Sequence, residues 1–187
     1  LKKDAFPEKV LNSLYKHTDL QITYHANMLA LVDGIEPKVL NLKMFLTEFI
    51  KHRKQVVFRR TQFELDEAKK REHILQGLKI AIDNIDAVIE TIKKSKDTDT
   101  AKVNLMTKFK LTEIQANAIL EMKLNRLAGL ERQKIEDELN EKIILITDLK
   151  DILAKPERIN EIVINETAEI KELFGDARKT VINPSRV

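Results

Sequence analysis

Cysteine and tryptophan are absent from the 187-residue sequence, and glycine and proline occur only four times each. Without cysteine the chain has no disulfide framework, which is typical of a cytoplasmic protein. No stretch of about 18 apolar residues is present, so the sequence predicts no transmembrane helix. Because helix breakers are rare and 34% of the residues are charged, the composition favours a mainly α-helical chain with long exposed helices.

A helical pattern extends over residues 40–94, which contain no proline and one glycine, Gly77. We expect one helix of roughly 80 Å at 1.5 Å per residue, too long to bury its apolar stripe without a partner helix. The stripe has a gap before Val56 and a charged stretch before Leu75. Its apolar residues are Leu42, Leu46, Phe49, Val56, Phe63, Leu75, Leu78, Ile82, Ile85, Ile89 and Ile92.

Residues 131–174 supply the partner helix, which Pro156 is expected to kink because proline lacks the amide donor. Residues 41–96 carry a net charge of +5 and residues 131–174 a net charge of −5. Opposite charges at flanking positions favour an antiparallel coiled coil of the two arms. The positions of the second stripe are Ile135, Leu139, Ile143, Ile146, Leu149, Leu153, Ile159, Ile162, Glu166, Ile170 and Leu173.

The N-terminal part, residues 1–40, predicts a short helix over 8–17, with Pro7 in its first turn, followed by a β-hairpin. Residues 20–24 and 28–32 are β-prone, and Asp33-Gly34 is a typical hairpin turn. This part is too small to form a domain, so we interpret it as the tail of one.

Residues 97–130 are expected to form a small helical knob at the tip of the arms, with a short helix over 101–109. Thr112 and Gln115 form a capping box for a second helix over 113–128, which Gly129 is expected to end. A knob this small has little interior, so its apolar surface predicts either a self-complementary dimer contact or packing onto the arm ends.

Within the knob, Ile114, Ala118 and Leu120 can pack inward, whereas Ile119 and Met122 are assigned to the surface. The predicted dimer contact consists of Ile119, Leu120, Met122, Lys123, Leu124 and Leu127.

Several sequence runs, which follow one another over nearly the whole chain, resemble the A subunits of bacterial type IIA DNA topoisomerases. They are 12–21 (NSLYKHTDLQ), 27–32 (NMLALV), 52–61 (HRKQVVFRRT), 115–124 (QANAILEMKL), 126–131 (RLAGLE) and 174–180 (FGDARKT). The resemblance implies five parts: the end of the tower region (1–40), a first coiled-coil arm (41–96), an exit-gate knob (97–130), a return arm (131–174) and a tail (175–187). Residues 127–131 resemble DNA gyrase more than topoisomerase IV, which stays the alternative.

In this family the full enzyme cuts one DNA duplex, passes a second duplex through the break using ATP, and reseals the first. The resemblance implies a homodimer joined at the knob, a transported DNA segment, a heterotetramer with an ATPase B subunit, and no membrane. It also implies that the catalytic tyrosine, Mg²⁺ and ATP lie in other parts of the enzyme, because Tyr15 and Tyr24 are not in the tyrosine motif. The chain alone is therefore expected to be catalytically silent, in a cytoplasmic, nucleoid-associated enzyme.

Five basic residues without an intervening acid lie in a ten-residue stretch: Lys51, Arg53, Lys54, Arg59 and Arg60. They could guide the transported duplex through phosphate contacts, or they could pair with the acidic return arm. His52 and His73 have no metal-ligand spacing and are interpreted as ordinary helix residues. A purely structural helical hairpin, such as a scaffold arm, remains the rival hypothesis from another class of protein.

Overall fold

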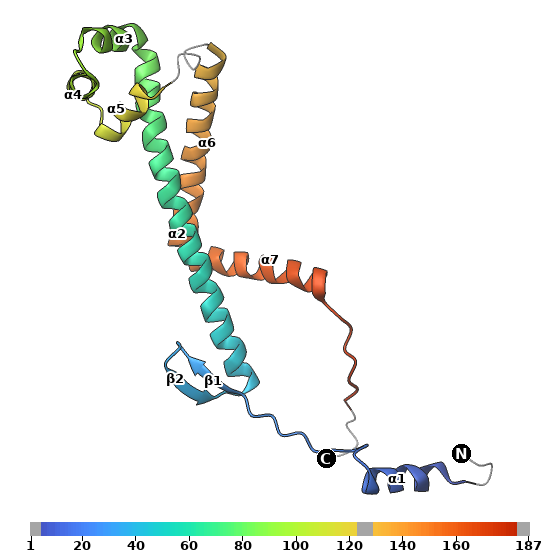
Figure 1. Ribbon diagram of the computed structural model, residues 1–187. Coiled ribbons are helices and arrows are strands. Elements are labelled where there is room, and N and C mark those ends of the chain that lie inside the picture. The colour runs from blue at the N-terminus through green and yellow to red at the C-terminus, as the bar shows by residue number, and fades with distance from the viewer. Residues whose placement is uncertain (1–4, 123–128, 183–187) are drawn as a thin grey trace. The chain divides into compact units, whose positions relative to one another are not determined.

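The computed structural model describes residues 5–122 and 129–182, without the side chains of residues 129–131. The chain divides into two compact units, Leu1–Phe49 and Ile50–Val187. Helix α2, Leu42–Asp83, begins in the first unit and continues into the second (Figure 1).

The first unit contains the predicted short helix and the predicted hairpin. Helix α1, Pro7–His17, has its proline at the first helical position, where the missing amide costs nothing. Strands β1, Leu29–Val32, and β2, Glu36–Val39, pair antiparallel across a turn in which Asp33 and Gly34 both have positive φ. The prediction of an extended strand at residues 20–24 is wrong, because β1 and β2 are the two strands of this sheet.

Helix α2 begins after a polar cap. The side-chain oxygen of Asn41 accepts a hydrogen bond from the Met44 amide at 2.9 Å. The predicted single helix over 40–94 is wrong at its far end, because α2 stops at Asp83 and α3, Ile85–Lys94, follows. Asn84 leaves the helical region, with φ −121° and ψ 35°, and its side chain donates to the Ile80 carbonyl at 2.9 Å. The Asn84 backbone amide also donates to the Ile80 carbonyl, at 3.2 Å, so the side-chain and backbone donors share one acceptor at the break.

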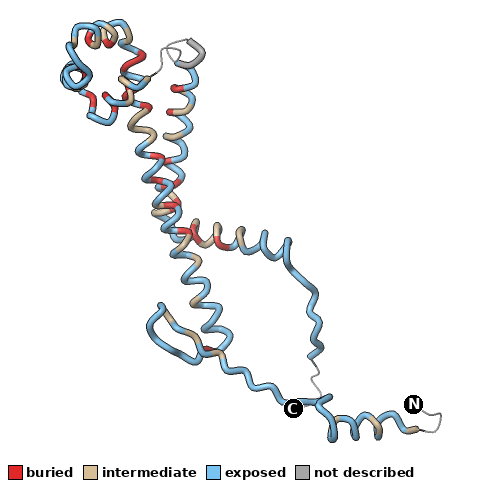
Figure 2. The backbone as a smooth tube through the Cα atoms, in the orientation of Figure 1, coloured by how far each residue is buried: buried red, intermediate tan, exposed pale blue. Residues whose placement is uncertain are grey.

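Helix α6, Gly129–Ala154, packs along α2, as the coiled-coil prediction requires (Figure 1). The buried positions of both helices face one another in Figure 2. They are Val57, Leu65, Ala68, Leu75 and Leu78 of α2, and Ile135, Leu139, Ile146, Leu149 and Ile152 of α6. The predicted register is wrong at Phe63, which is 66% exposed. Leu65 takes the buried place because it, and not Phe63, keeps the helical spacing from Val57 and Thr61 to Ala68.

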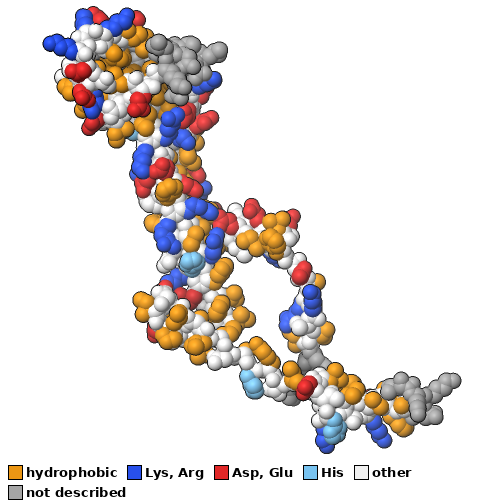
Figure 3. Space-filling model, in the orientation of Figure 1, with side chains coloured by type: hydrophobic (Ala, Val, Ile, Leu, Met, Phe, Trp, Pro, Cys, Tyr) orange, Lys and Arg blue, Asp and Glu red, His pale blue; other side chains and the backbone are white. Residues whose placement is uncertain are grey.

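Ion pairs flank this apolar seam, and the prediction of lateral charge pairing between the arms is confirmed. Arg71 donates two hydrogen bonds of 2.7 Å to Glu138, and Lys79 lies 3.9 Å from Glu136. One pair has the reverse polarity, with Asp83 on α2 and Arg132 on α6 at 2.6 Å. Figure 3 shows basic and acidic side chains interleaved along the two helices. Exposed pairs contribute only about 0–1 kcal/mol each, so they specify the register more than they stabilise it.

The tip contains α3, α4 (Thr98–Phe109) and α5 (Glu113–Leu120). The predicted capping box is present, with Thr112 accepting from the Gln115 amide and the Gln115 side chain accepting from the Thr112 amide. The helix predicted over 113–128 ends as α5 at Leu120, and residues 123–128 lie outside the described part of the chain. Gly129, which is expected from the sequence to end that helix, begins α6 instead.

The predicted break at Pro156 is confirmed. Lys155 is extended, with φ −119° and ψ 105°, and α7, Pro156–Phe174, turns away from the axis of α6 (Figure 1). Ile159 and Val163 of α7 still pack into the core that contains Val57. The predicted apolar stripe does not stay buried further along α7, because Ile170 and Leu173 are both exposed. The return arm is thus two helices, of which α6 forms most of the seam with α2.

Candidate functional site

The tip has a core of its own, built from α3, α4, α5 and the adjoining parts of α2 and α6. Leu105 and Ala116 are fully buried in it, together with Val88 and the α2 residue Leu78. The α6 residues Ile135 and Leu139 belong to the same cluster, so the tip and the adjacent end of the arm form one packed body. A change of tip packing would therefore also alter the packing of the adjoining turns of α2 and α6.

The predicted orientation of α5 is wrong for two residues. Ile119, assigned to the surface, is 3% exposed and belongs to the tip core, whereas Ile114, assigned to the interior, is 61% exposed. The reason is the helix phase: Gln115, Ala116 and Ile119 are the buried positions of α5. Of the other predicted dimer residues, Leu120 and Met122 are half-buried, and Lys123, Leu124 and Leu127 lie outside the described residues.

Side-chain hydrogen bonds join the tip to α2. The side-chain nitrogen Nε2 of Gln115 donates to the His73 backbone carbonyl at 2.8 Å. The His73 ring nitrogen Nε2 lies 2.7 Å from the Thr112 hydroxyl. Gln115 is only 5% exposed, and both of its side-chain polar atoms are bonded, because its oxygen also accepts the Thr112 amide. Its side chain lies over Gly77, whose lack of a side chain makes this approach of α5 to α2 possible. His73 is thus a structural hydrogen-bonding residue of the α2–tip junction.

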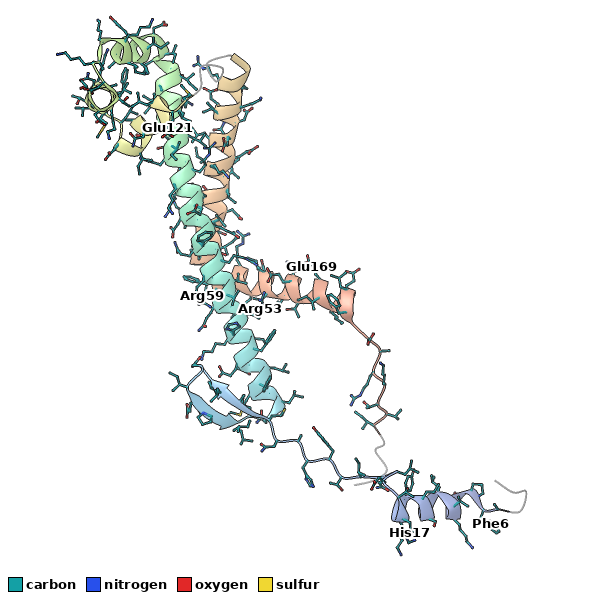
Figure 4. The ribbon with its side chains drawn as sticks, viewed as in Figure 1. Phe6, His17, Arg53, Arg59, Glu121 and Glu169 are labelled. Atoms are coloured by element: carbon teal, nitrogen blue, oxygen red, sulfur yellow. The ribbon has the colours of Figure 1, made fainter. Side chains whose placement is uncertain are left out.

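The five basic residues at 51–60 do not form one surface. Arg53 and Arg60 both bind the Glu166 carboxylate of α7, each with a guanidinium nitrogen at 2.7 Å from a different oxygen. Lys51 also has an interaction. For Lys54 and Arg59, no carboxylate of the described residues lies within 4.0 Å. Arg53 and Arg59 both lie on α2 near the start of α7 (Figure 4).

Glu166 is the acidic residue on which this pairing depends. Its side chain is 28% exposed, and the hydrogen bond from Arg60 lowers the pKa of its carboxyl, with Arg53 adding to the effect and partial burial opposing it. The sequence contains a signal for this role, because Glu166 occupies a position at which the helical stripe of the return arm is otherwise apolar. We interpret it as the charged contact that holds α7 on α2.

The junction between α6 and α7 has a second set of ion pairs. Arg158, in the first turn of α7, donates to Asp148 at 2.7 Å and to Asp151 at 3.0 Å, both on α6. These bonds raise the pKa of Arg158, with Asp148 contributing most. Hydrogen bonds from Lys155 and then Arg158 lower the pKa of Asp151. The Arg158 ion pairs therefore join α7 to α6 across the bend, whereas the Glu166 pairs join α7 to α2.

Residues 5–122 and 129–182 hold no group of three or more His, Asp or Glu side chains that could bind a metal ion. Among the same residues, no helix is both long and apolar enough to cross a bilayer.

The fold defines a helical arm protein, in which two long helices pair through an apolar seam, one of them continuing past a bend and both joined to a small helical tip. The family model for the A subunit of DNA gyrase and topoisomerase IV matches residues 1–168. The chain belongs to this family.

Individual relatives agree with this assignment. The chain is 56% identical to the DNA gyrase A subunit of Clostridium acetobutylicum over 182 residues, which are 97% of this chain and 22% of that protein. It is 48% identical to the protein of the same name from Streptococcus pneumoniae over 187 residues, or 100% of this chain and 23% of that protein. A third, from Dehalogenimonas lykanthroporepellens, is 47% identical over the same shares of both chains. The chain thus spans less than a quarter of the length of these relatives.

Proposed function

We propose that the chain is the exit-gate arm of a DNA gyrase A subunit, which closes the protein cavity below the cut duplex by dimerising through its tip. Support comes from the family membership and from the architecture, a long two-helix arm with a separately packed tip. The relatives named above are all gyrase A subunits, which favours gyrase over topoisomerase IV, the second candidate.

The activity of the whole enzyme would lie outside this chain. We infer ATP-dependent strand passage in a heterotetramer with an ATPase B subunit, with Mg²⁺, ATP and the catalytic tyrosine bound or contained elsewhere. The arm would contribute the dimer contact and the route for the transported DNA segment, in the cytoplasm and without catalysis of its own.

The dimer contact proposed for the tip centres on Leu120, Met122, Lys123, Leu124 and Leu127. Ile119 does not belong to it, because a side chain that is buried in the core of its own chain has no surface left for a partner. An apolar contact of modest area would suit a gate that must open and close once in each reaction cycle.

Pro156 is the proposed hinge of the gate. The backbone at Lys155 already departs from the helix, so a rotation there breaks no helical hydrogen bond of Pro156, which has no amide hydrogen. The ion pairs of Arg158 and Glu166 would oppose the movement of α7 while they are formed, and α7 would be able to move when they break.

Guidance of the transported duplex is assigned to Lys54 and Arg59 rather than to all five basic residues. Arg53 and Arg60 already bind Glu166, so a phosphate would have to compete with a carboxylate for them. Salt-sensitive contacts from two cations would be weak, as is appropriate for a duplex that has to pass.

Sedimentation equilibrium on the full chain tests the gate proposal. We expect the wild type to be a dimer and Leu124→Glu combined with Leu127→Glu to be a folded monomer, with circular dichroism confirming the helical content. The matched control is Ile144→Glu combined with Ile164→Glu, which places the same two charges on exposed apolar residues of α6 and α7 and should leave the dimer intact. A monomeric wild type, or a dimeric double variant, would refute the proposed interface.

A further inference from the structure

A groove of about 440 Å³ lies between α2 and the first turn of α7, next to the bend. Its apolar surface comes from Phe58, Pro156 and Ile159, and its polar side chains are Lys54, Gln55, Arg59 and Asn160. We refer to it as the hinge groove. Its volume falls within the range typical of small-molecule sites, roughly 300–1,000 Å³.

The charge of the hinge groove is entirely positive. Lys54 and Arg59 line it, no Asp or Glu does, and neither cation has a carboxylate partner among the residues that the structure describes. Their neighbours Arg53 and Arg60 differ in this respect, since both are bound to Glu166. The groove thus combines two cations that have no carboxylate partner with two side-chain amides and an apolar floor.

We propose that the hinge groove binds a small organic anion with a flat apolar body, of the aromatic carboxylate class. The carboxylate would accept hydrogen bonds from Lys54 and Arg59, and the planar Arg59 guanidinium is also suited to stack on a ring. The ring system would lie against Phe58 and Pro156, which are exposed, and against the edge of the buried Ile159, removing the exposed apolar surface from water. Gln55 and Asn160 can both donate and accept, and so accommodate further polar groups.

The apolar floor distinguishes this ligand class from a phosphate of DNA. A duplex backbone or inorganic phosphate would contact the two cations but leave Phe58 and Pro156 in water. Its binding would therefore include no contribution from the burial of apolar surface in the groove. The inference is independent of the proposed gate function, because it rests only on the groove within this chain. Where both hold, the ligand would compete with DNA for Lys54 and Arg59 and would tie α2 to α7 across the bend.

Isothermal titration of the full chain with naphthalene-1-carboxylate at low ionic strength tests the proposal. We expect saturable binding of one molecule per chain with a Kd below about 1 mM. The neutral naphthalene-1-carboxamide should bind at least about tenfold more weakly, since it lacks the charge that Lys54 and Arg59 recognise. Inorganic phosphate should also bind at least about tenfold more weakly, since it has no apolar body to bury.

Variants locate the site. Lys54→Ala, Arg59→Ala and Phe58→Ala should each weaken naphthalene-1-carboxylate binding at least about threefold. All three residues are exposed on α2, so the fold should survive. Lys69→Ala removes an exposed lysine from the same helix outside the groove and should change nothing. The proposal is overturned by a failure to saturate, by equal binding of the carboxamide or of phosphate, or by a loss in Lys69→Ala equal to that in Lys54→Ala.

Discussion

The side chain of Gln115 occupies the space that a side chain at position 77 would need. A Cβ atom built on Gly77 would lie 2.6 Å from both Cβ and Cγ of Gln115, closer than real carbon contacts allow. Glycine inside an exposed helix ordinarily costs about 0.5–1 kcal/mol relative to alanine. Its presence near the C-terminal end of α2 is therefore explained by the docking of α5, since Gln115 also binds the His73 carbonyl one turn earlier.

Gly77→Ala should lower the free energy of unfolding by about 1–3 kcal/mol, although alanine is the better helix former, because the tip must move off α2. Urea denaturation followed by circular dichroism measures the change. In the double variant with Gln115→Gly both clashing carbon atoms are removed, so Gly77→Ala should cost less in that background. Equal costs of Gly77→Ala with and without Gln115 would show that the two side chains do not compete for this space.

The register of the α2–α6 seam is tested by two neighbouring α2 residues. Leu65→Ala should destabilise the chain by about 2–4 kcal/mol, because it leaves a cavity opposite α6. Phe63→Ala removes a larger side chain but should cost below about 1 kcal/mol, since Phe63 is mostly exposed. The order of the two free energies of unfolding would be reversed if the seam ran through Phe63.

The Glu166 pairs should make the stability of the chain depend on pH. Because Arg60 and Arg53 lower its pKa in the folded chain, Glu166 stabilises the fold above the ordinary carboxyl pKa of 4.5, and this contribution is lost as the pH falls through the lowered value. Glu166→Gln should cost about 1 kcal/mol near neutral pH and progressively less in acid. Urea denaturation from about pH 7 to about pH 3 measures the difference.

The control for this titration is Glu169→Gln, on the same helix and exposed (Figure 4). Within the described ranges Glu169 is in no ion pair, so its variant should follow the wild type at every pH. If Glu166→Gln and Glu169→Gln had the same pH profile, the two arginines would not hold the carboxylate in solution.

DNA guidance by α2 is expected to depend on Lys54 and Arg59. Arg59→Glu should weaken binding of duplex DNA at low salt and reduce the slope of log affinity against log salt by about one unit for each phosphate that is no longer bound. Lys69→Glu makes the same kind of charge change elsewhere on α2 and should have a smaller effect. Unchanged DNA affinity of Arg59→Glu at low salt would dismiss the guiding role.

Periodicity and helix breakers are sufficient to predict the helical arms, the hairpin turn, the capping box and the break at Pro156. These features depend on local spacing and local hydrogen bonds, which a single sequence records. The end of α2 at Asp83 escapes such reasoning because Asn84 is compatible with either a helix or a break, and the core formed by α3 decides between them. The prediction for Phe63 fails for another reason: the buried stripe passes through the polar Thr61, so a count of apolar positions alone misses the spacing that selects Leu65. The prediction for Ile119 fails because α5 is short and apolar on more than one face, so only packing shows that Ile119 and not Ile114 is buried.

The basic stretch shows a further limit of sequence reasoning. Five cations within ten residues suggest one candidate surface, yet Arg53 and Arg60, on one helical face, pair with a residue more than a hundred positions away. Helical phase can separate these two from Lys54 and Arg59, but their partner is found only from the tertiary structure. The relation of Gly77 to Gln115 is invisible in the sequence for the same reason.

The most direct test of the gate is the distance between the tips of two copies of the chain. Because the sequence has no cysteine, Asn117→Cys introduces a single spin-label site on the exposed side of α5 without further changes. Pulsed electron resonance on that variant should give a short distance between the labels of two chains. A label at Glu157→Cys, at the start of α7, should give a longer one. Absence of a dipolar signal from the tip label, or a shorter distance at Glu157 than at Asn117, would contradict dimerisation through the tip.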